Sequence, residues 1–257
     1  MFRKILCLAF VLLLALCGLG CSEEEEAAGQ DEGEAAQLSS LASRTQLQVG
    51  EAVLPMPAPK GFRALKQEDP QFHSSTDLEP GEVLLRVYGK SPSKNPGPER
   101  KDLIWVTTLD KWLEAQVDEL GFIAQKQQLQ KESAPGGPEV LRNFRVAAIG
   151  WLAAEPSYAY SLGMLDNSSH QISFGRVLKE SVEGKALYSC RLDALLYRNG
   201  KLLGLHFLHH MGEGYEDLPM AIADFLSYLY ALQALDGNLP DREVMDQSLG
   251  RYLPAGK

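Results

Sequence analysis

The sequence predicts an α+β domain in which helices pack on an antiparallel β-sheet. Three features indicate this class. Apolar runs of alternating spacing follow one another from residue 158 to residue 211, Asn199-Gly200 separates the last two, and an apolar helical segment over 218–235 comes next. Hydrophobic residues make up 45% of the chain and charged residues 23%. This balance is typical of a globular domain, and it excludes both wholesale disorder and a polytopic membrane protein.

The first 20 of the 257 residues have the pattern of an export signal peptide. Arg3 and Lys4 precede an uncharged apolar run from Ile5 to Leu16, and this run is too short for a comfortable membrane span. We therefore expect residues 1–20 to be removed during export.

The next residues, Cys17-Gly18-Leu19-Gly20-Cys21-Ser22, resemble the lipobox of bacterial lipoproteins, although Gly18 stands where Leu is commoner. In that family a small residue precedes a cysteine that is lipidated and becomes the new N-terminus. The resemblance implies acyl chains such as palmitate on Cys21, and several chains on one cysteine hold a protein stably on a membrane. By resemblance to lipoprotein sorting in Gram-negative bacteria, Ser22 favours the outer membrane, facing the periplasm. Ordinary secretory cleavage near the same place is the alternative.

An acidic, flexible linker is expected over residues 21–50. Seven acidic residues and no basic residue occupy positions 22–37, and such a segment buries too little apolar surface to fold. The net charge of the whole chain is −9, which argues against nucleic acid as a partner. Residues 51–257 are then predicted to form a single globular domain.

The domain is expected to open with an extended segment, a strand and a helix. Several prolines exclude a helix from residues 53–62. Residues 82–89, a largely apolar run bounded by glycines, predict a strand, and the composition of residues 89–102 predicts a loop. Thr107 or Thr108 is expected to cap an amphipathic helix that Gly121 ends.

The middle of the domain has weaker patterns. Residues 122–130 alternate and are mostly polar on one side, which favours a half-exposed or edge strand. Ala134-Pro135-Gly136-Gly137-Pro138 predicts a turn. The apolar residues of segment 140–154 match neither the strand nor the helix period cleanly; a strand is favoured, with a helix as the alternative.

The last part of the domain has the clearest patterns. Residues 158–165 and 171–179 predict two strands around the polar turn Asn167-Ser168-Ser169. Asn199-Gly200 predicts a type I′ hairpin, whose two central residues both need positive φ. Asp217 is expected to cap a helix that runs to Leu235 and buries a stripe of Leu, Ile and Phe.

The order of these elements resembles the fold shared by Mog1, PsbP and DcrB-like bacterial lipoproteins. The residues that carry this resemblance, over about 51–236, are Leu54-Pro55-x-Pro57 with Gly61-Phe62, Thr107-Thr108-Leu109-Asp110, and the final hairpin followed by Leu218 to Leu235. It implies an α-β-α sandwich. Members of that group are mostly non-enzymatic binding or assembly factors, so it implies no catalytic residue and no cofactor.

The most metal-like cluster is His206-Phe207-Leu208-His209-His210, because imidazole is a common ligand of transition metals. On a regular strand His206 and His210 share one face about 13 Å apart, while His209 points to the other face. These three side chains then cannot hold one ion. A metal site would need a bulge, or His73 or His170 from elsewhere, and satisfied structural histidines are the expected alternative.

Cys190 is the one cysteine left after Cys7 and Cys17 leave with the signal and Cys21 carries lipid, so no intramolecular disulfide is expected. It lies in an alternating apolar run, which favours a buried inert thiol. Seven aromatic residues are expected either to fill the core or to line a ligand cleft: Trp105, Trp112, Trp151, Tyr158, Tyr160, Tyr228 and Tyr230.

The sequence lacks the nucleophile elbow, the zinc-protease motif and paired cysteines, so we expect no catalytic residue, metal or cofactor. These observations indicate a membrane-anchored cell-envelope lipoprotein that binds an envelope protein or assists its assembly. One alternative is a carrier of a small hydrophobic ligand, held between the sheet and the apolar terminal helix. Another is a metal-dependent envelope enzyme that uses residues 206–210.

Overall fold

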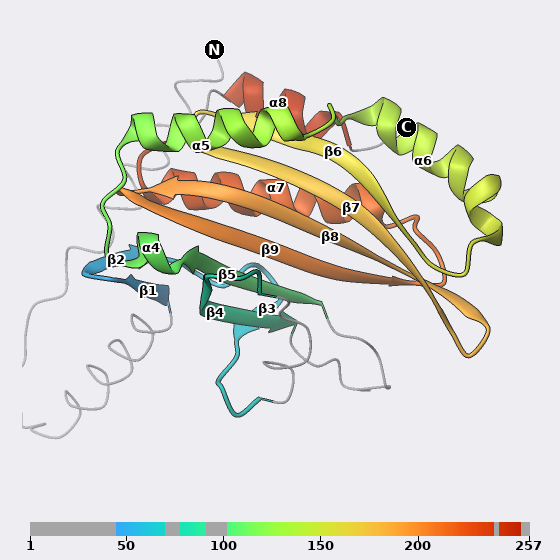
Figure 1. The fold of residues 1–257 in the computed structure, drawn as a ribbon, viewed down its shortest axis with the longest axis horizontal. Helices are drawn as coiled ribbons and strands as arrows, with labels where there is room; N and C mark the ends of the chain where they lie inside the picture. The colour runs from blue at the N-terminus through green and yellow to red at the C-terminus, as the bar shows by residue number, and fades with distance from the viewer. Residues whose placement is uncertain (1–44, 70–77, 91–101, 239–241, 253–257) are drawn as a thin grey trace, which may run out of the picture. The chain divides into compact units, whose positions relative to one another are not determined.

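Seven strands form the main sheet in the order β3-β4-β5-β9-β8-β7-β6, and all neighbours are antiparallel (Figure 1). The strands are Phe62–Ala64 (β3), Glu82–Lys90 (β4), Leu103–Leu109 (β5), Tyr158–Ser168 (β6), Gln171–Val182 (β7), Lys185–Arg198 (β8) and Lys201–Gly212 (β9). Only β5 and β9 pair across a long stretch of sequence. The expected α+β class, an antiparallel sheet with helices, is confirmed.

This computed structural model describes residues 45–69, 78–90, 102–238 and 242–252. The signal peptide, Cys21, most of the acidic linker, His73 and most of the expected loop over 89–102 lie outside the described residues. One compact unit of the chain begins at Ala42.

A two-stranded hairpin precedes the main sheet and corrects the expected boundary of the linker. Gln46–Val49 (β1) pairs with Ala52–Pro55 (β2), and Leu47, Val49 and Leu54 are buried in the core. The prediction that the linker extends to Gly50 is therefore wrong, because Gln46–Val49 already belongs to the folded domain as β1. Gln46–Val49 alternates between exposed and buried positions, but a run of four residues is too short a pattern to separate strand from linker.

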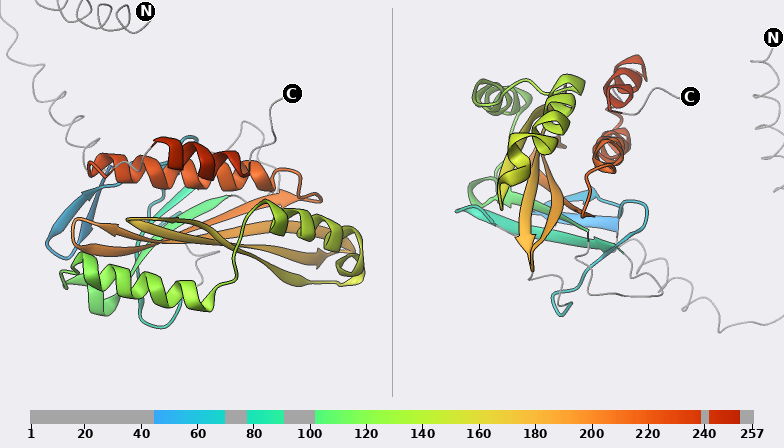
Figure 2. Two further views of the ribbon diagram at one scale, coloured as in Figure 1. Left: turned by 90° about the horizontal axis from the view of Figure 1, so that it is seen from above. Right: turned by 90° about the vertical axis from the view of Figure 1, so that its right-hand side faces the viewer.

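Helices cover both faces of the main sheet (Figure 2). Leu218–Leu235 (α7) and Arg242–Gly250 (α8) lie on one face, and Glu119–Glu132 (α5) lies on the other. Pro138–Ile149 (α6) packs against the edge strand β6. The largest core cluster lies on the α7 side, and a smaller one on the α5 side surrounds Trp105.

The helix expected between Thr107 and Gly121 is wrong. Leu103–Leu109 is strand β5, and only Asp110–Leu113 (α4) forms a helical turn before α5. Neither threonine caps a helix: Thr108 Oγ1 donates a hydrogen bond to the Leu202 carbonyl at 2.8 Å across the sheet, and Thr107 turns to the opposite face. The reason is burial, because β5 lies between β4 and β9 and has both faces covered, so six of its seven residues are buried without alternation.

The half-exposed strand expected over residues 122–130 is also wrong, because α5 occupies this segment. Asp118 caps the helix by accepting a hydrogen bond from the Gly121 N–H at 2.7 Å, so the glycine falls in the first turn instead of ending a helix. Repeated Gln and Lys favour a helix. Only Phe122 is fully buried, which explains why the apolar periodicity was weak.

The strand favoured for residues 140–154 is wrong, and the alternative, a helix, is correct. Pro138 begins α6, and Leu141, Phe144, Ala147 and Ala148 form its buried face at helical spacing. Trp151–Ala154 (η1) continues as a turn of 3₁₀-helix. The pattern was unclear because Val146, Ile149 and Trp151 are apolar yet exposed. The expected turn before α6 is confirmed, and Pro135 bridges to Met164 at the edge of β6.

The remaining strands match the predictions. The strands β6, β7, β8 and β9 form a meander; the turn expected at Asn167-Ser168-Ser169 falls at residues 169–170, because Asn167 and Ser168 belong to β6. Asn199 has φ 46° and Gly200 has φ 76°, so both central residues of the hairpin have positive φ, as a type I′ turn requires. Residues at alternate positions of β8 and β9 face the core under α7: Cys190, Leu192, Ala194 and Leu196 of β8, and Leu203, Leu205 and Phe207 of β9.

The predicted helix over Leu218–Leu235 is α7, and its expected stripe is buried: Leu218, Ile222, Phe225, Leu226, Leu229 and Leu232. Among the described helices it alone is long and apolar enough to cross a membrane, and 56% of that window is buried within the fold. Arg198 links it to the sheet by a buried ion pair with Asp236. The helix α8 was not predicted from the sequence; its Ser248 Oγ donates a hydrogen bond to Asp166 of β6 at 3.0 Å.

Candidate functional site

The structure places two of the three histidines of β9, His206 and His209, on opposite faces of the main sheet. His209 lies on the α7 side, where it borders a groove, and His206 lies on the α5 side, in a cluster of charged residues. This separation follows from the two-residue repeat of a strand, and it confirms that His206 and His209 point to opposite faces.

The groove lies between α7 and the sheet and has a volume of about 880 Å³. Its walls come from the segment before β3, from β5 and β9, and from one side of α7. Most of the wall is apolar, and the residues that contribute to it include Pro57, Pro59, Phe62, Ile104, Phe207, Met220, Ala221, Phe225, Tyr228, Ala231 and Leu232. Volumes of this size are typical of small-molecule sites.

Part of the groove wall is charged, and Asp102 organises this part. The Asp102 carboxylate accepts hydrogen bonds from Lys90 Nζ at 3.0 Å, from the His209 ring at 2.9 Å and from the His210 N–H at 2.9 Å. Burial acts to raise the pKa of Asp102, but these donors outweigh it and lower that pKa. Since His209 uses Nδ1 on Asp102, its Nε2 is left without a hydrogen-bond partner among the described residues.

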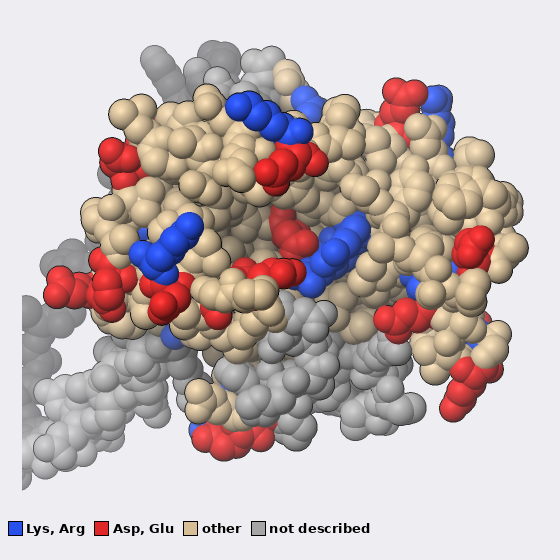
Figure 3. Space-filling model, in the orientation of Figure 1, with Lys and Arg blue, Asp and Glu red and all other residues tan. Residues whose placement is uncertain are grey.

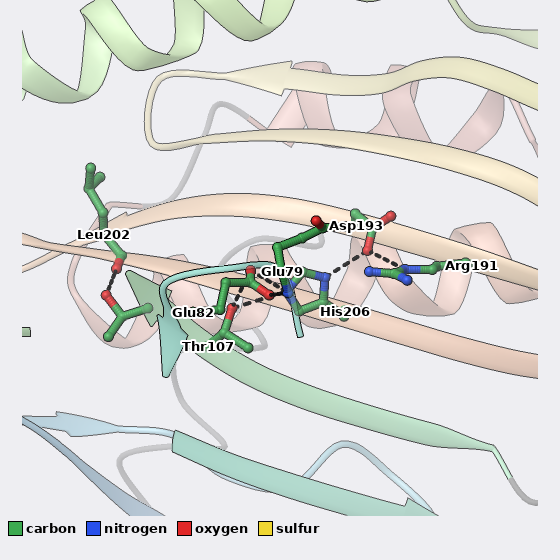
Figure 4. Close-up of polar contacts among 8 residues, drawn as sticks. Glu79, Glu82, Thr107, Arg191, Asp193, Leu202 and His206 are labelled. Carbon is green, nitrogen blue, oxygen red and sulfur yellow. Dashed lines mark hydrogen bonds and ion pairs between the residues drawn. The ribbon is translucent and has the colours of Figure 1, made fainter. Parts of the chain in front are cut away.

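The cluster on the opposite face is built around His206 (Figure 4). Its Nδ1 lies 2.7 Å from Asp193 Oδ1, and its Nε2 lies 3.1 Å from Thr107 Oγ1 and 3.7 Å from Glu82 Oε1. The Arg191 guanidinium donates to Asp193 at 3.1 Å. The cluster therefore joins β4, β5, β8 and β9, and charges of both signs gather in a hollow of this face, below α5 (Figure 3).

Packing holds the His206 ring in place. The ring stacks on Trp105 with 5.2 Å between centroids, and the Arg191 guanidinium lies over the same Trp105 ring at 5.4 Å from its centroid. A Cβ at Gly204 would come within 2.5 Å of Thr107 Oγ1, so glycine leaves room for the contact between Thr107 and His206. Burial acts to raise the pKa of Asp193, but His206 and Arg191 outweigh it and lower that pKa.

The Asp193 carboxylate, the His206 imidazole and the Thr107 hydroxyl follow one another in the order of a catalytic triad. Thr107, however, is 1% exposed and is also bonded to Glu82 at 3.2 Å. Both ring nitrogens of His206 have partners within the sheet. This arrangement is that of a satisfied buried network, which links strands rather than presenting a reactive group.

The metal site considered for residues 206–210 is not assembled. His206 and His209 lie on opposite faces, each bound to its own carboxylate, and His170 lies beside Tyr197, with its Nδ1 2.8 Å from Ser169 Oγ. Within the described part of the chain, no group of three or more His, Cys, Asp or Glu residues could hold a metal ion.

Cys190 is buried and free, and burial raises the pKa of its thiol to about 12, which is the environment of an inert thiol. The aromatic residues divide between the two expected roles. Trp105 and Tyr230 are core residues, Tyr228 lines the groove, and Trp151 is 69% exposed on η1.

Sequence reasoning missed the acidic partners of the two histidines. Asp102 precedes β5 and Asp193 lies on β8, so no spacing in the sequence links either carboxylate to β9. A signal was present in Asp193, which is a charged residue within the apolar run of β8 and pairs directly with His206.

Comparisons with known proteins add no relative: no protein-family model matches the chain, and no curated protein or solved structure matches it. The functional interpretation therefore rests on the chemistry of the groove and of the two histidine clusters.

Proposed function

We propose that this chain is a lipid-anchored binding module of a bacterial cell envelope, non-enzymatic, held through acyl chains on Cys21 and displayed from the outer membrane into the periplasm. The groove under α7 is its binding site, and a small hydrophobic ligand is its occupant. The single observation that carries the proposal is the groove itself, which is mostly apolar and has a volume of about 880 Å³. An α-β-α sandwich of the Mog1, PsbP and DcrB-like kind is part of the same proposal.

Three further observations support a binding role. The groove wall includes the outward Met220, which is 54% exposed, so apolar surface is accessible from solvent at this place. The buried His206 network uses its polar groups on one another. The free thiol of Cys190 is buried.

Protein binding or assembly, the function expected from the sequence, is the second candidate. The openness of the groove at Met220 favours it, because an exposed apolar side chain at a rim can contact a partner segment. An unidentified envelope protein would then occupy the same groove.

Site-specific photo-crosslinking in intact cells tests the proposal. We expect a photoreactive residue in place of Met220 to give an adduct, and the same residue in place of Glu119, exposed on α5, to give none. Intact mass of the extracted protein then identifies the adduct: an increase below about 1 kDa marks a small ligand, in the size range such pockets hold, and a conjugate of protein size marks a partner.

The same mass measurement tests the anchor. A diacylglyceryl mass on the mature chain, lost in Cys21→Ala together with membrane fractionation, is the expected result. A soluble, unlipidated mature chain would contradict the anchored location, and equal crosslinking at positions 220 and 119 would contradict the groove as the binding site.

A further inference from the structure

The groove is elongated, and its length follows from the part of α7 that lines it. Residues from Asp217 to Leu232 contribute to the wall, and at the rise of an α-helix they span about 22 Å. One acyl chain of a membrane lipid spans about half of the hydrocarbon core, or about 15 Å. The groove is therefore long enough for a single extended acyl chain with a head group at one end.

The walls favour an acyl chain over an extended peptide. Pro57 and Pro59 have no backbone N–H, and the Pro57 carbonyl already accepts a hydrogen bond from Tyr228 OH at 2.7 Å. A peptide placed there would leave buried backbone groups without partners, which costs free energy for each such group. A hydrocarbon chain needs no such partners.

The charged part of the wall offers hydrogen-bond donors to a head group. Lys90 is 57% exposed at its side chain, and only one of its three ammonium protons is needed for Asp102. The Nε2 of His209, which borders the groove, has no hydrogen-bond partner among the described residues, and it is a donor when the ring is protonated. Because the Asp102 carboxylate is already shared by three donors, a second anion is the group that fits between Lys90 and His209.

We propose that the groove binds a single-chain amphipathic lipid with an anionic head, its acyl chain lying along α7 and its carboxylate or phosphate between Lys90 and His209. This inference rests on the proposed function, of which it names the ligand class. A free fatty acid and a lysophospholipid share the required chemistry.

Native mass spectrometry of the full mature protein, released from detergent micelles, tests this ligand class with three probes: palmitate, 1-palmitoyl-lysophosphatidylglycerol and hexadecanol. We expect one molecule of an anionic probe to bind at least ten-fold more tightly than hexadecanol. The anionic probe that binds more tightly shows whether the groove prefers a carboxylate or a phosphate head group.

Four variants locate the ligand. Lys90→Gln and His209→Gln keep a hydrogen-bonding side chain beside Asp102, and each is expected to remove the preference for the anion while leaving hexadecanol binding unchanged. Ala231→Trp, in the groove wall, is expected to abolish binding of all three probes. Its matched control is Ala124→Trp, on the exposed surface of α5, which is expected to bind like the unaltered protein.

The possible failures are distinguishable. Equal binding of hexadecanol and palmitate, unchanged in the Lys90 and His209 variants, overturns the anionic head. Binding that survives Ala231→Trp overturns the groove as the lipid site. If no probe binds while position 220 crosslinks to a protein, the lipid class is overturned and the groove remains a binding site; if position 220 crosslinks to nothing, the proposed function itself fails.

Discussion

At the scale of single residues, two histidines three positions apart have different roles because a strand turns alternate side chains to opposite faces. The sequence predicted this alternation, and it also predicted the burial of Cys190. It could not predict that Asp102 and Asp193 would be the partners of His209 and His206, because β5 and β8 bring these carboxylates to β9 only in the folded sheet. The sequence around a histidine does not indicate which distant carboxylate will contact it.

The lowered pKa values of these two carboxyl groups predict an acid limit to stability. A carboxyl whose pKa is lower in the folded than in the unfolded chain stabilises the fold above its unfolded pKa, about 3.9, and this contribution is lost as the pH falls through the folded value. We expect the free energy of unfolding to fall below about pH 4. Asp193→Asn should be less stable at pH 7 and should lose part of this pH dependence.

Urea unfolding at several values between pH 7 and pH 3 measures both effects, with the exposed Glu51→Gln as the control. If Asp193→Asn retained the whole acid slope of the unaltered protein, the assignment of that slope to Asp193 would be wrong.

At the scale of elements, the predictions succeeded where local pattern and tertiary environment agree. The β8–β9 hairpin and α7 have strong periods, and their turn and stop residues adopt the backbone angles that these residues favour. The predictions failed at β5, α5 and α6. In these three elements the apolar pattern depends on how the element is buried in the fold, and not on its own period. The strand β5 is covered on both faces, α5 buries little, and α6 exposes apolar residues at its end.

The docking of α6 depends on Gly136. A Cβ at this position would lie 2.1 Å from the Met164 carbonyl oxygen, so glycine permits the segment before α6 to approach the backbone of β6. We expect Gly136→Ala to destabilise the protein by about 1–3 kcal/mol, the usual cost of an overpacked site. Hydrogen exchange should accelerate first in Pro138–Ile149.

Ser133→Ala, three residues before Gly136 at the end of α5, serves as the control and should leave exchange in α6 unchanged. If exchange in Gly136→Ala accelerated uniformly throughout α6, α7 and the sheet, Gly136 would not act through this local approach.

At the scale of the whole molecule, the pairing of β5 with β9 joins the two parts of the main sheet. The chain completes β3, β4 and β5, forms three helices, and then lays down a four-stranded meander whose last strand, β9, returns to β5. The order of elements suggested an antiparallel sheet, but no local pattern specifies which early strand meets the meander. Pairing with β4 on one side and β9 on the other leaves six of the seven residues of β5 buried.

This topology predicts the order of folding. Contacts within the β8–β9 hairpin are local, whereas the pairing of β5 with β9 closes a loop of about a hundred residues, so its entropy cost is larger. We expect Leu192→Ala in β8 to slow refolding, and Val106→Ala in β5 mainly to speed unfolding. Stopped-flow kinetics in urea distinguishes these effects; refolding slowed equally by both substitutions would indicate that β5 docks before or with the hairpin.

The two ends of this sheet have a consequence for a protein held at a crowded surface. One edge strand, β3, has only three residues, and the other, β6, carries Pro135 and its neighbours against its open side near Met164. Short or covered edges offer few free backbone groups to another chain. In the proposed anchored state, acyl chains on Cys21 would concentrate neighbouring copies in two dimensions, and these edges would then hinder joining of sheet to sheet and aggregation.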